Sequence, residues 1–149
     1  MAAVTFTVSG KPFGKQRPKF SSVGKYVKTY TPSETVNYEN LVKLMYQHEI
    51  GRMMFEKDTP LKVIIIACYE IPKSSSKRQT ERMRKGELRP TKKPDTDNIA
   101  KIICDSLNGI AWHDDAQVVD LKVSKWYSDT PQVEVTIEEV RYDTETDDS

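Results

Sequence analysis

Residues 61–69 restrict the fold of this chain more than any other stretch, because apolar side chains occupy both of their alternating faces. Strands of this kind are typical of the middle of a sheet that has another layer on each side. We therefore expect a central strand here, covered on both faces and ended by Pro72. The apolar run is far too short to span a membrane.

Three further segments alternate between apolar and polar residues, as half-buried strands do. They are residues 4–8, 119–123 and 133–137. The turn-forming residues 128–131 predict that the last two strands pair as a hairpin, and a shorter hairpin is expected around residues 22–24. These segments supply the remaining strands of the expected sheet.

A long helix is expected between the first strands and the central one. Thr31 and Glu34 have the spacing of a capping box, and Pro32 suits the first helical position. The helix should continue to Ile50 and end before Gly51. Its apolar stripe is typical of a core or dimer contact. Strands and helices in this order predict an α+β fold.

Length and composition indicate one domain. The chain has 149 residues, of which 37% are hydrophobic and 30% charged, which is ordinary for a globular protein with its own core. We expect the domain to cover residues 1–142, and the acidic, apolar-free tail 143–149 to be disordered. Cys68 and Cys104 lack metal-site spacing and are expected to be buried free thiols, which fits a reducing cytoplasm.

The net charge of +1 conceals two basic blocks. Residues 1–30 contain no acid, and residues 73–93, here called the basic arm, contain nine bases and two acids. The arm includes a short helix through Met83 and leads directly to Asp95. Both blocks are either solvated surface or contacts for a phosphate backbone, and we favour the second interpretation. The candidate DNA contacts are Lys11, Lys15, Arg17, Lys19, Lys77, Arg78, Arg82, Arg84, Lys92 and Lys93.

A cluster of acids follows the basic arm at the start of a second helix. Asp95 stands where this helix should begin, and Asn108 with Gly109 should end it. Asp97, Lys101 and Asp105 follow one another at i, i+4 spacing, so they share one stripe of the helix. The opposite face is apolar and should meet the core.

Two interpretations of these acids remain open from the residues alone. Asp95 is a common type of helix cap, and Asp97 with Lys101 would make an ordinary ion pair. Alternatively, Asp95, Asp97 and one of Asp114 and Asp115 would bind a hard divalent cation through their oxygens. The second acidic pair favours the metal site. The spacing does not fit a calcium-binding EF-hand loop.

The two clusters together resemble the RusA-type Holliday junction resolvases of bacteria and their phages. The resemblance rests on Pro94-Asp95-x-Asp97-Asn98-x-x-Lys101, Asp105-x-Leu107 and Trp112-x-Asp114-Asp115-Ala116-Gln117-Val118. It extends from about residue 93 to the strand near Trp126 and is weaker in the N-terminal third. The basic arm departs from the family pattern as a long insertion.

The resemblance implies a mixed sheet packed with helices, a homodimer and Mg2+, with Mn2+ as a substitute. It implies that Asp95, Asp97 and Asp115 bind the metal, that Asp114 is a neighbour of the site, and that Lys101 is the catalytic lysine. It also implies paired symmetric nicks in four-way DNA junctions, as part of DNA recombination and repair, that leave 5'-phosphates. Such an enzyme would work in the bacterial cytoplasm, encoded by the host or by a phage.

Two other functions are compatible with the residues. The chain could be a DNA-binding module whose acids are only helix caps, or a less selective nuclease for flaps and other branched DNA. Dependence on metal separates the first from an enzyme, and a comparison of substrates separates the second. The dimer surface is expected on the stripe of the helix up to Ile50 or on the edge of the 117–140 hairpin.

Overall fold

The computed structural model describes residues 3–15, 19–23, 26–30 and 32–141, and the side chains of residues 19–23 and 26–30 are not among the described atoms. Arg17 and the acidic tail 143–149 therefore lie outside the described residues, as does the expected domain boundary after residue 142. The side chain of Lys19 is likewise not described.

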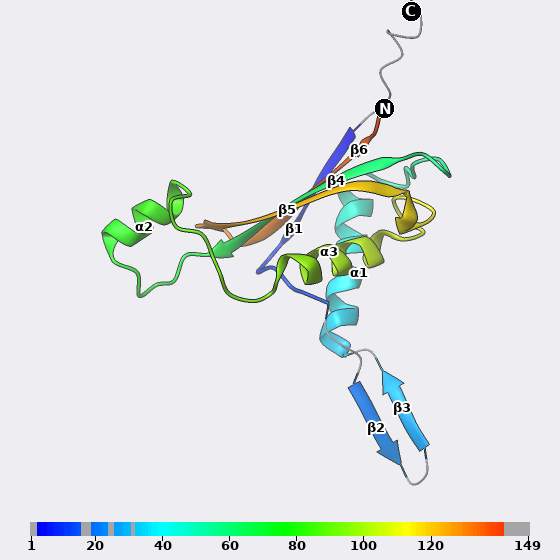
Figure 1. Cartoon of the computed structure of the whole chain (residues 1–149), viewed down its shortest axis with the longest axis horizontal. Helices are drawn as coiled ribbons and strands as arrows, with labels where there is room; N and C mark the ends of the chain where they lie inside the picture. The colour runs from blue at the N-terminus through cyan, green and yellow to red at the C-terminus, as the bar shows by residue number, and fades with distance from the viewer. Residues whose placement is uncertain (1–2, 16–18, 24–25, 31, 142–149) are drawn as a thin grey trace, which may run out of the picture.

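Four strands form a mixed sheet. They are β1 (Ala3–Ser9), β4 (Leu61–Glu70), β5 (Val118–Ser128) and β6 (Gln132–Glu139), in the order β1-β6-β4-β5. β6 is antiparallel to both β1 and β4, whereas β5 is parallel to β4 and forms one edge (Figure 1). Because helices pack on one face of this mostly antiparallel sheet (Figure 1), the expected α+β class is confirmed.

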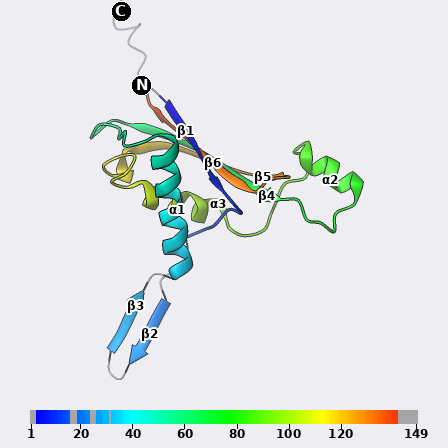
Figure 2. The same ribbon diagram turned by 180° about the vertical axis from the view of Figure 1, so that it is seen from behind.

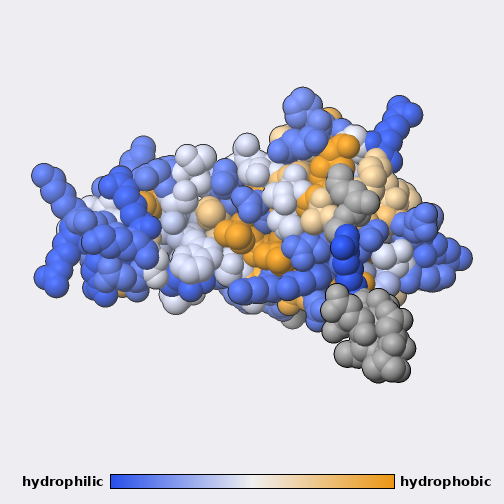
Figure 3. Space-filling view, turned by 90° about the horizontal axis from the view of Figure 1, so that it is seen from above, coloured by the Kyte–Doolittle hydropathy of each residue, from blue (hydrophilic) through white to orange (hydrophobic). Residues whose placement is uncertain are grey.

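β4 is central, as expected, but the prediction that both of its faces are covered is wrong. Alternate residues such as Val63 and Ile65 are fully buried against the helices, whereas Ile64 and Ile66 on the opposite face are only half-buried. Figure 1 shows α1 and α3 on the same side of the sheet. Seen from above, apolar surface lies near the middle of the molecule between polar side chains (Figure 3).

The expected hairpin at residues 128–131 is also wrong. β5 and β6 are not neighbours, because β4 lies between them and pairs with both. Strands two places apart in a sheet are separated by about 10 Å, a distance that the short connection after Ser128 can span. The turn-forming residues predict a short connection, but they do not determine which strand lies beside β5 in the sheet.

Two helices cover the buried face of the sheet. They are α1 (Ser33–Glu49) and α3 (Thr96–Leu107), and they contribute Val42, Tyr46 and the α3 isoleucines to the core. The predicted end of α1 is confirmed by Gly51, whose φ is +94°. The described helix has Pro32 as its N-cap residue. The predicted capping box involves Thr31, which lies outside the described residues.

Two smaller units extend from this body. The predicted hairpin is confirmed as β2 (Lys19–Val23) and β3 (Tyr26–Tyr30), and it lies beyond the N-terminal end of α1 in both Figures 1 and 2. The predicted short helix of the basic arm is confirmed as α2 (Lys77–Arg84), with Ser76 and Gln79 forming a capping box. Among the described residues, none of the helices is both long and apolar enough to cross a membrane.

Candidate functional site

Asp95 and Asp97 lie at the exposed N-terminal end of α3. Asp95 is the N-cap residue, but its carboxylate makes no capping hydrogen bond. Asp97 is in the first helical turn, and Lys101 pairs with Asp105 at 3.6 Å instead of with Asp97. The Asp95 carboxylate therefore does not cap the helix, and Asp97 does not form the expected ion pair with Lys101. Among the described side chains, neither carboxylate has a hydrogen-bond or ion-pair partner.

Asp114 and Asp115 belong to a short 3-10 turn, η1 (Asp115–Gln117), that packs against α3. The Asp114 carboxylate accepts a hydrogen bond from the Ala116 backbone N–H at 2.9 Å, so it caps the turn. Asp115 is exposed and does not share this capping function. The two neighbouring acids therefore differ, since Asp114 stabilises the turn that presents Asp115.

Buried contacts hold η1 in place. Trp112 is fully buried, and its Nε1–H donates to the side chain of Asn108 at 2.9 Å. The Gln117 side chain accepts hydrogen bonds from two backbone N–H groups before the turn and donates to the carbonyls of Glu56 and Thr59. The position of Asp115 thus depends on packing and on residues far apart in the sequence.

The pKa of Cys104 shows which charges surround the middle of α3. Burial, together with the charges of Asp115 and Asp105 and against the opposing charge of Lys101, raises the pKa of this thiol to about 11. Asp115 therefore lies within electrostatic range of the α3 stripe that carries Lys101. The structure brings these expected site residues to one side of α3, with Asp95 and Asp97 at its N-terminal end.

Lys15 is held between two acids from different helices. Its Nζ lies 2.9 Å from the Glu39 carboxylate of α1 and 3.4 Å from the Asp105 carboxylate of α3. Burial alone would lower the pKa of Lys15, but the hydrogen bonds and charges of these two acids outweigh burial and raise it. The cation expected to contact DNA therefore already neutralises protein carboxylates.

Other lysines gather in a cleft that ends at Asp95. One hollow of about 610 Å³ is lined by Lys11, Lys93 and Asp95, among others. An adjoining hollow of about 470 Å³ shares Lys11 and Lys93 and adds Lys73 and Lys92. Of these cations, Lys11, Lys92 and Lys93 were expected to contact DNA. Lys73 was not selected, although it is the first residue of the basic arm.

The walls of this cleft are joined by close contacts. The backbone N–H of Lys15 donates to the Asn98 carbonyl at 3.0 Å, and a Cβ at Gly14 would lie only 2.7 Å from the Pro94 side chain. On the other wall, the Tyr69 hydroxyl donates to the Pro94 carbonyl at 2.8 Å. Burial, together with the charge of Asp95, raises the pKa of Tyr69 to about 12. No pattern in the sequence had indicated Tyr69.

The basic arm is fastened to the end of β5. Arg84 makes hydrogen bonds from two of its nitrogens to Asp129, and the Arg89 guanidinium lies 3.4 Å from the centre of the Trp126 ring. Gly86 allows this approach, because a Cβ there would lie 2.8 Å from the Trp126 ring. The docked arm thus extends the body of the protein past β5.

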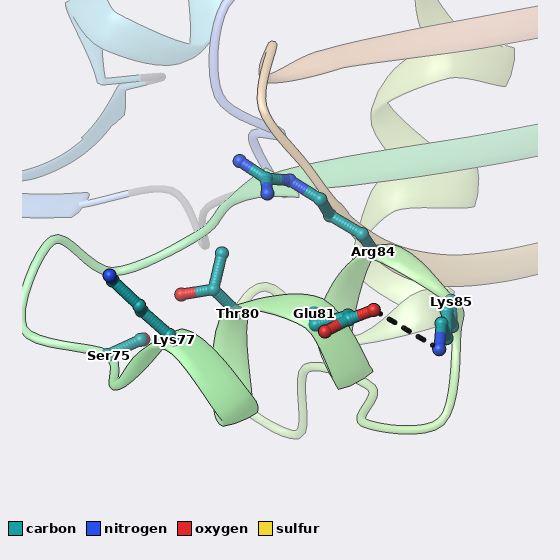
Figure 4. A pocket seen from close by; sticks show the side chains of 6 residues that line it. All are labelled: Ser75, Lys77, Thr80, Glu81, Arg84 and Lys85. Atoms are coloured by element: carbon teal, nitrogen blue, oxygen red, sulfur yellow. Dashed lines mark ion pairs between the residues drawn. The ribbon is translucent and has the colours of Figure 1, made fainter.

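The cations expected on α2 have different surroundings. Arg84 is tied to Asp129, and Arg82 lies 3.8 Å from Glu87. Figure 4 shows a hollow of about 720 Å³ on the arm, with Lys77 at one end and the pair of Glu81 and Lys85 at the other. Within the described part of the chain, Lys77 and Arg78 have no ion-pair partner.

The acids suit a hard divalent cation in their chemistry. Carboxylate oxygens are the ligands that Mg2+ prefers, and one or two of them commonly suffice when water and substrate phosphates complete the shell. In the described ranges no three His, Cys, Asp or Glu side chains form a group that could hold a metal ion. The unpaired Asp95 and Asp97 nevertheless fit an ion that is completed by substrate and water.

Two comparisons with known proteins match most of this chain. A family model described as endodeoxyribonuclease RusA matches residues 9–138, a range that includes the acids of α3 and η1. The chain is also 38% identical over 140 residues to the uncharacterized protein YqaN of Bacillus subtilis (strain 168). That match covers 94% of this chain and 99% of the relative.

Proposed function

Because the chain belongs to the RusA endodeoxyribonuclease family, we propose that it resolves four-way DNA junctions by paired, symmetric, Mg2+-dependent nicks. The proposal rests on the exposed carboxylates of Asp95 and Asp97, which have no partner among the described side chains. Asp95 also lines the end of the lysine-lined cleft. Family membership implies nuclease activity on branched DNA. The paired nicks, the residue roles and the dimer are proposals.

Nucleases of this family depend on metal. Asp95, Asp97 and Asp115 would hold the ion, with Asp114 beside them. When bound, Mg2+ (or Mn2+ as a substitute) supplies an activated water and neutralises charge on the scissile phosphate. Asp115 belongs to η1, whereas Asp95 and Asp97 lie at the start of α3. Binding of the substrate phosphate would therefore bring the three carboxylates together around the ion.

Lys101 is placed to act on the phosphate itself. Its side chain is 63% exposed, and it lies one helical turn beyond Asp97, a rise of about 6 Å along α3. The ammonium group can therefore reach a phosphate beside Asp97 and offset the charge that develops as the P–O bond breaks. Asp105, 3.6 Å from its Nζ, keeps Lys101 on this stripe when no DNA is bound.

The lysine cleft and the basic arm would hold the DNA. Lys11, Lys92 and Lys93 line the cleft, and Lys77 and Arg78 lie on exposed α2 without ion-pair partners in the described residues. Cations in these places bind phosphates with little regard for sequence and position the duplex arms of a branched substrate. The remaining expected contacts are Lys15, Arg17, Lys19, Arg82 and Arg84.

A dimer follows from the reaction that we propose. A four-way junction must be cut on two opposed strands to give two duplexes, and each chain supplies one set of acids. Two chains related by a two-fold axis present identical sites to a substrate of similar symmetry.

Asparagine substitution at the acids tests the proposal. Asp95→Asn, Asp97→Asn and Asp115→Asn should each reduce Mg2+-dependent cutting of a synthetic junction by at least about a thousandfold, because each removes a ligand charge. Junction binding should persist or tighten, since negative charge beside phosphate is removed. Cutting and binding are measured on gels, with and without Mg2+ and with flaps and plain duplex as competing substrates.

Asp58→Asn is the matched control, because Asp58 is an exposed aspartate in the turn before β4. It should cut at the wild-type rate. Near-normal turnover by any of the three site variants at saturating protein would remove that residue from the metal set. Binding without cutting by the wild type at any metal concentration would favour a DNA-binding module, and equal cutting of flaps and junctions would favour a less selective nuclease.

A further inference from the structure

The backbone just before α3 is held by side chains from the sheet. Residues 92–94 form the last part of the connection from α2 to α3 (Figure 1). The Tyr69 hydroxyl donates to the Pro94 carbonyl at 2.8 Å, and the Lys125 ammonium donates to the Lys92 carbonyl. The two donors come from the C-terminal parts of β4 and β5. The segment that leads into α3 is therefore attached to the sheet at two points.

The two donors also contact each other. The parallel register of β4 and β5 places Lys125 beside Ala67, and Tyr69 lies two residues after Ala67. The side chains of Tyr69 and Lys125 therefore project from the same face of the sheet. The Lys125 Nζ lies 5.2 Å from the centre of the Tyr69 ring, within the range of a cation–π contact. Because Tyr69 is only 4% exposed, its ring is fixed in the body of the protein.

Hydrogen bonds on both sides of Asp95 fix the direction in which its side chain leaves the backbone. The Pro94 carbonyl belongs to the peptide plane before Asp95, and Tyr69 holds this plane. The Asp95 carbonyl belongs to the plane after it and accepts from the Ile99 N–H at 3.1 Å. Since peptide groups are planar, holding both planes fixes the backbone of Asp95 at φ −73° and ψ 157°. Only the torsions of its side chain remain free.

Other contacts do not replace the hydroxyl of Tyr69. The Asp95 carboxylate is exposed and makes no capping hydrogen bond, so it does not orient itself. Ile99 is fully buried and fixes α3, but helix ends fray, and an N-cap residue can move while the helix stays in place. Among the described residues, no other side chain donates a hydrogen bond to the Pro94 carbonyl.

We propose that Tyr69 is a positioning residue that fixes the direction of the Asp95 carboxylate, with Lys125 as a second anchor of the same segment. The inference rests on the proposed function, in which Asp95 is a metal ligand. Tyr69 acts through the backbone of Pro94 and not on the ion or the phosphate. Loss of a group that orients a metal ligand commonly lowers metal affinity or activity by about ten- to a hundredfold. Binding of DNA by exposed lysines does not depend on this hydroxyl.

Tyr69→Phe tests the inference, because it removes the hydroxyl and keeps the ring. In the free protein, without metal or DNA, the NMR order parameters of the backbone amides at residues 95–97 should fall from about 0.85, the value of a rigid backbone, towards about 0.6. With Mg2+ and a synthetic junction, kcat should fall by about tenfold, and the Mg2+ concentration for half-maximal cutting should rise. The junction dissociation constant should stay at the wild-type value.

Tyr46→Phe is the matched control. Tyr46 is fully buried, and its hydroxyl donates to the Met53 carbonyl at 2.6 Å, so this variant loses the same type of hydrogen bond. The segment before α3 is not part of that bond. In urea unfolding, Tyr46→Phe should lose about as much stability as Tyr69→Phe. It should nevertheless keep the wild-type kcat and the wild-type order parameters at residues 95–97.

Lys125→Met tests the second anchor separately, because it keeps the Tyr69 hydrogen bond. It should increase the mobility of residues 92–93 more than that of residues 95–97. Unchanged order parameters or an unchanged kcat in Tyr69→Phe, or equal losses in Tyr46→Phe, would each overturn the inference. A wild type that cuts no branched DNA would count against the proposed function, while the order parameters would still decide whether the hydroxyl orders the start of α3.

Discussion

At the scale of single residues, lysines that look equivalent in the sequence have different surroundings. Lys11 lies exposed in the cleft, whereas the Lys15 side chain is 22% exposed and bridges Glu39 and Asp105. A partly buried cation between two carboxylates contributes to the fold, because its removal takes one ion-pair partner from each acid and leaves Asp105 with Lys101 alone. An exposed lysine without such partners is available to a phosphate.

We therefore predict opposite effects for two alanine substitutions. Lys15→Ala should lower the free energy of unfolding by about 1–3 kcal/mol. Lys11→Ala should change it by less than about 0.5 kcal/mol, while the slope of log binding constant against log salt should fall by about 0.9. Urea unfolding and DNA titrations at several salt concentrations measure the two quantities. Equal stability of both variants would mean that the Lys15 bridge is as weak as an exposed ion pair.

At the scale of elements, the basic arm is positioned by packing as well as by charge. The α2 helix has no buried residue, so its position depends on contacts made at its C-terminal end and beyond. Gly86 has a φ of +78° and touches the Trp126 ring, and Arg84 reaches Asp129. The hydrogen bonds and charge of Arg84 lower the pKa of Asp129. This tie is therefore present above the ordinary pKa of an aspartate and is lost as the pH falls through the lowered value.

Gly86→Ala should release the arm. The new Cβ would meet Trp126 at 2.8 Å, and the positive φ adds about 1 kcal/mol of strain. Trypsin should then cleave within residues 77–93 several times faster, and the Trp126 fluorescence should shift to longer wavelength. Gly51→Ala shares the positive φ but has no atom within 4 Å of its new Cβ, so it should leave the arm resistant. Equal cleavage of both variants would show that the Trp126 contact does not hold the arm.

At the scale of the whole molecule, paired cutting requires two sets of acids in one complex. Wild-type chains mixed with an excess of Asp95→Asn chains should form dimers with one active site. On a plasmid with an extruded cruciform, such dimers should nick one strand and give open circles, whereas wild-type dimers give linear DNA. If linear product instead remained proportional to the wild-type chains, and the protein had the mass of a monomer, the dimer would be excluded.

The sequence alone determined the features that depend on local spacing. Alternation identified the strands, the apolar run identified the central strand, and Asp95 with Asn108 bounded the second helix. The two acidic clusters were recognisable because a helix start and a short turn each need only a few adjacent residues. The family was identifiable from the same residues, and the match over residues 9–138 confirmed it.

Tertiary structure alone decided what depends on neighbours far along the chain. The hairpin expected after β5 failed because the long apolar β4 pairs on both of its edges, which no short-range turn signal reveals. Lys15 became a bridge because acids from two helices converge on it only after folding. Strand order and charge pairing depend on residues that are far apart in the chain. The local sequence therefore identifies the possible partners, and packing in the folded protein determines which of them pair.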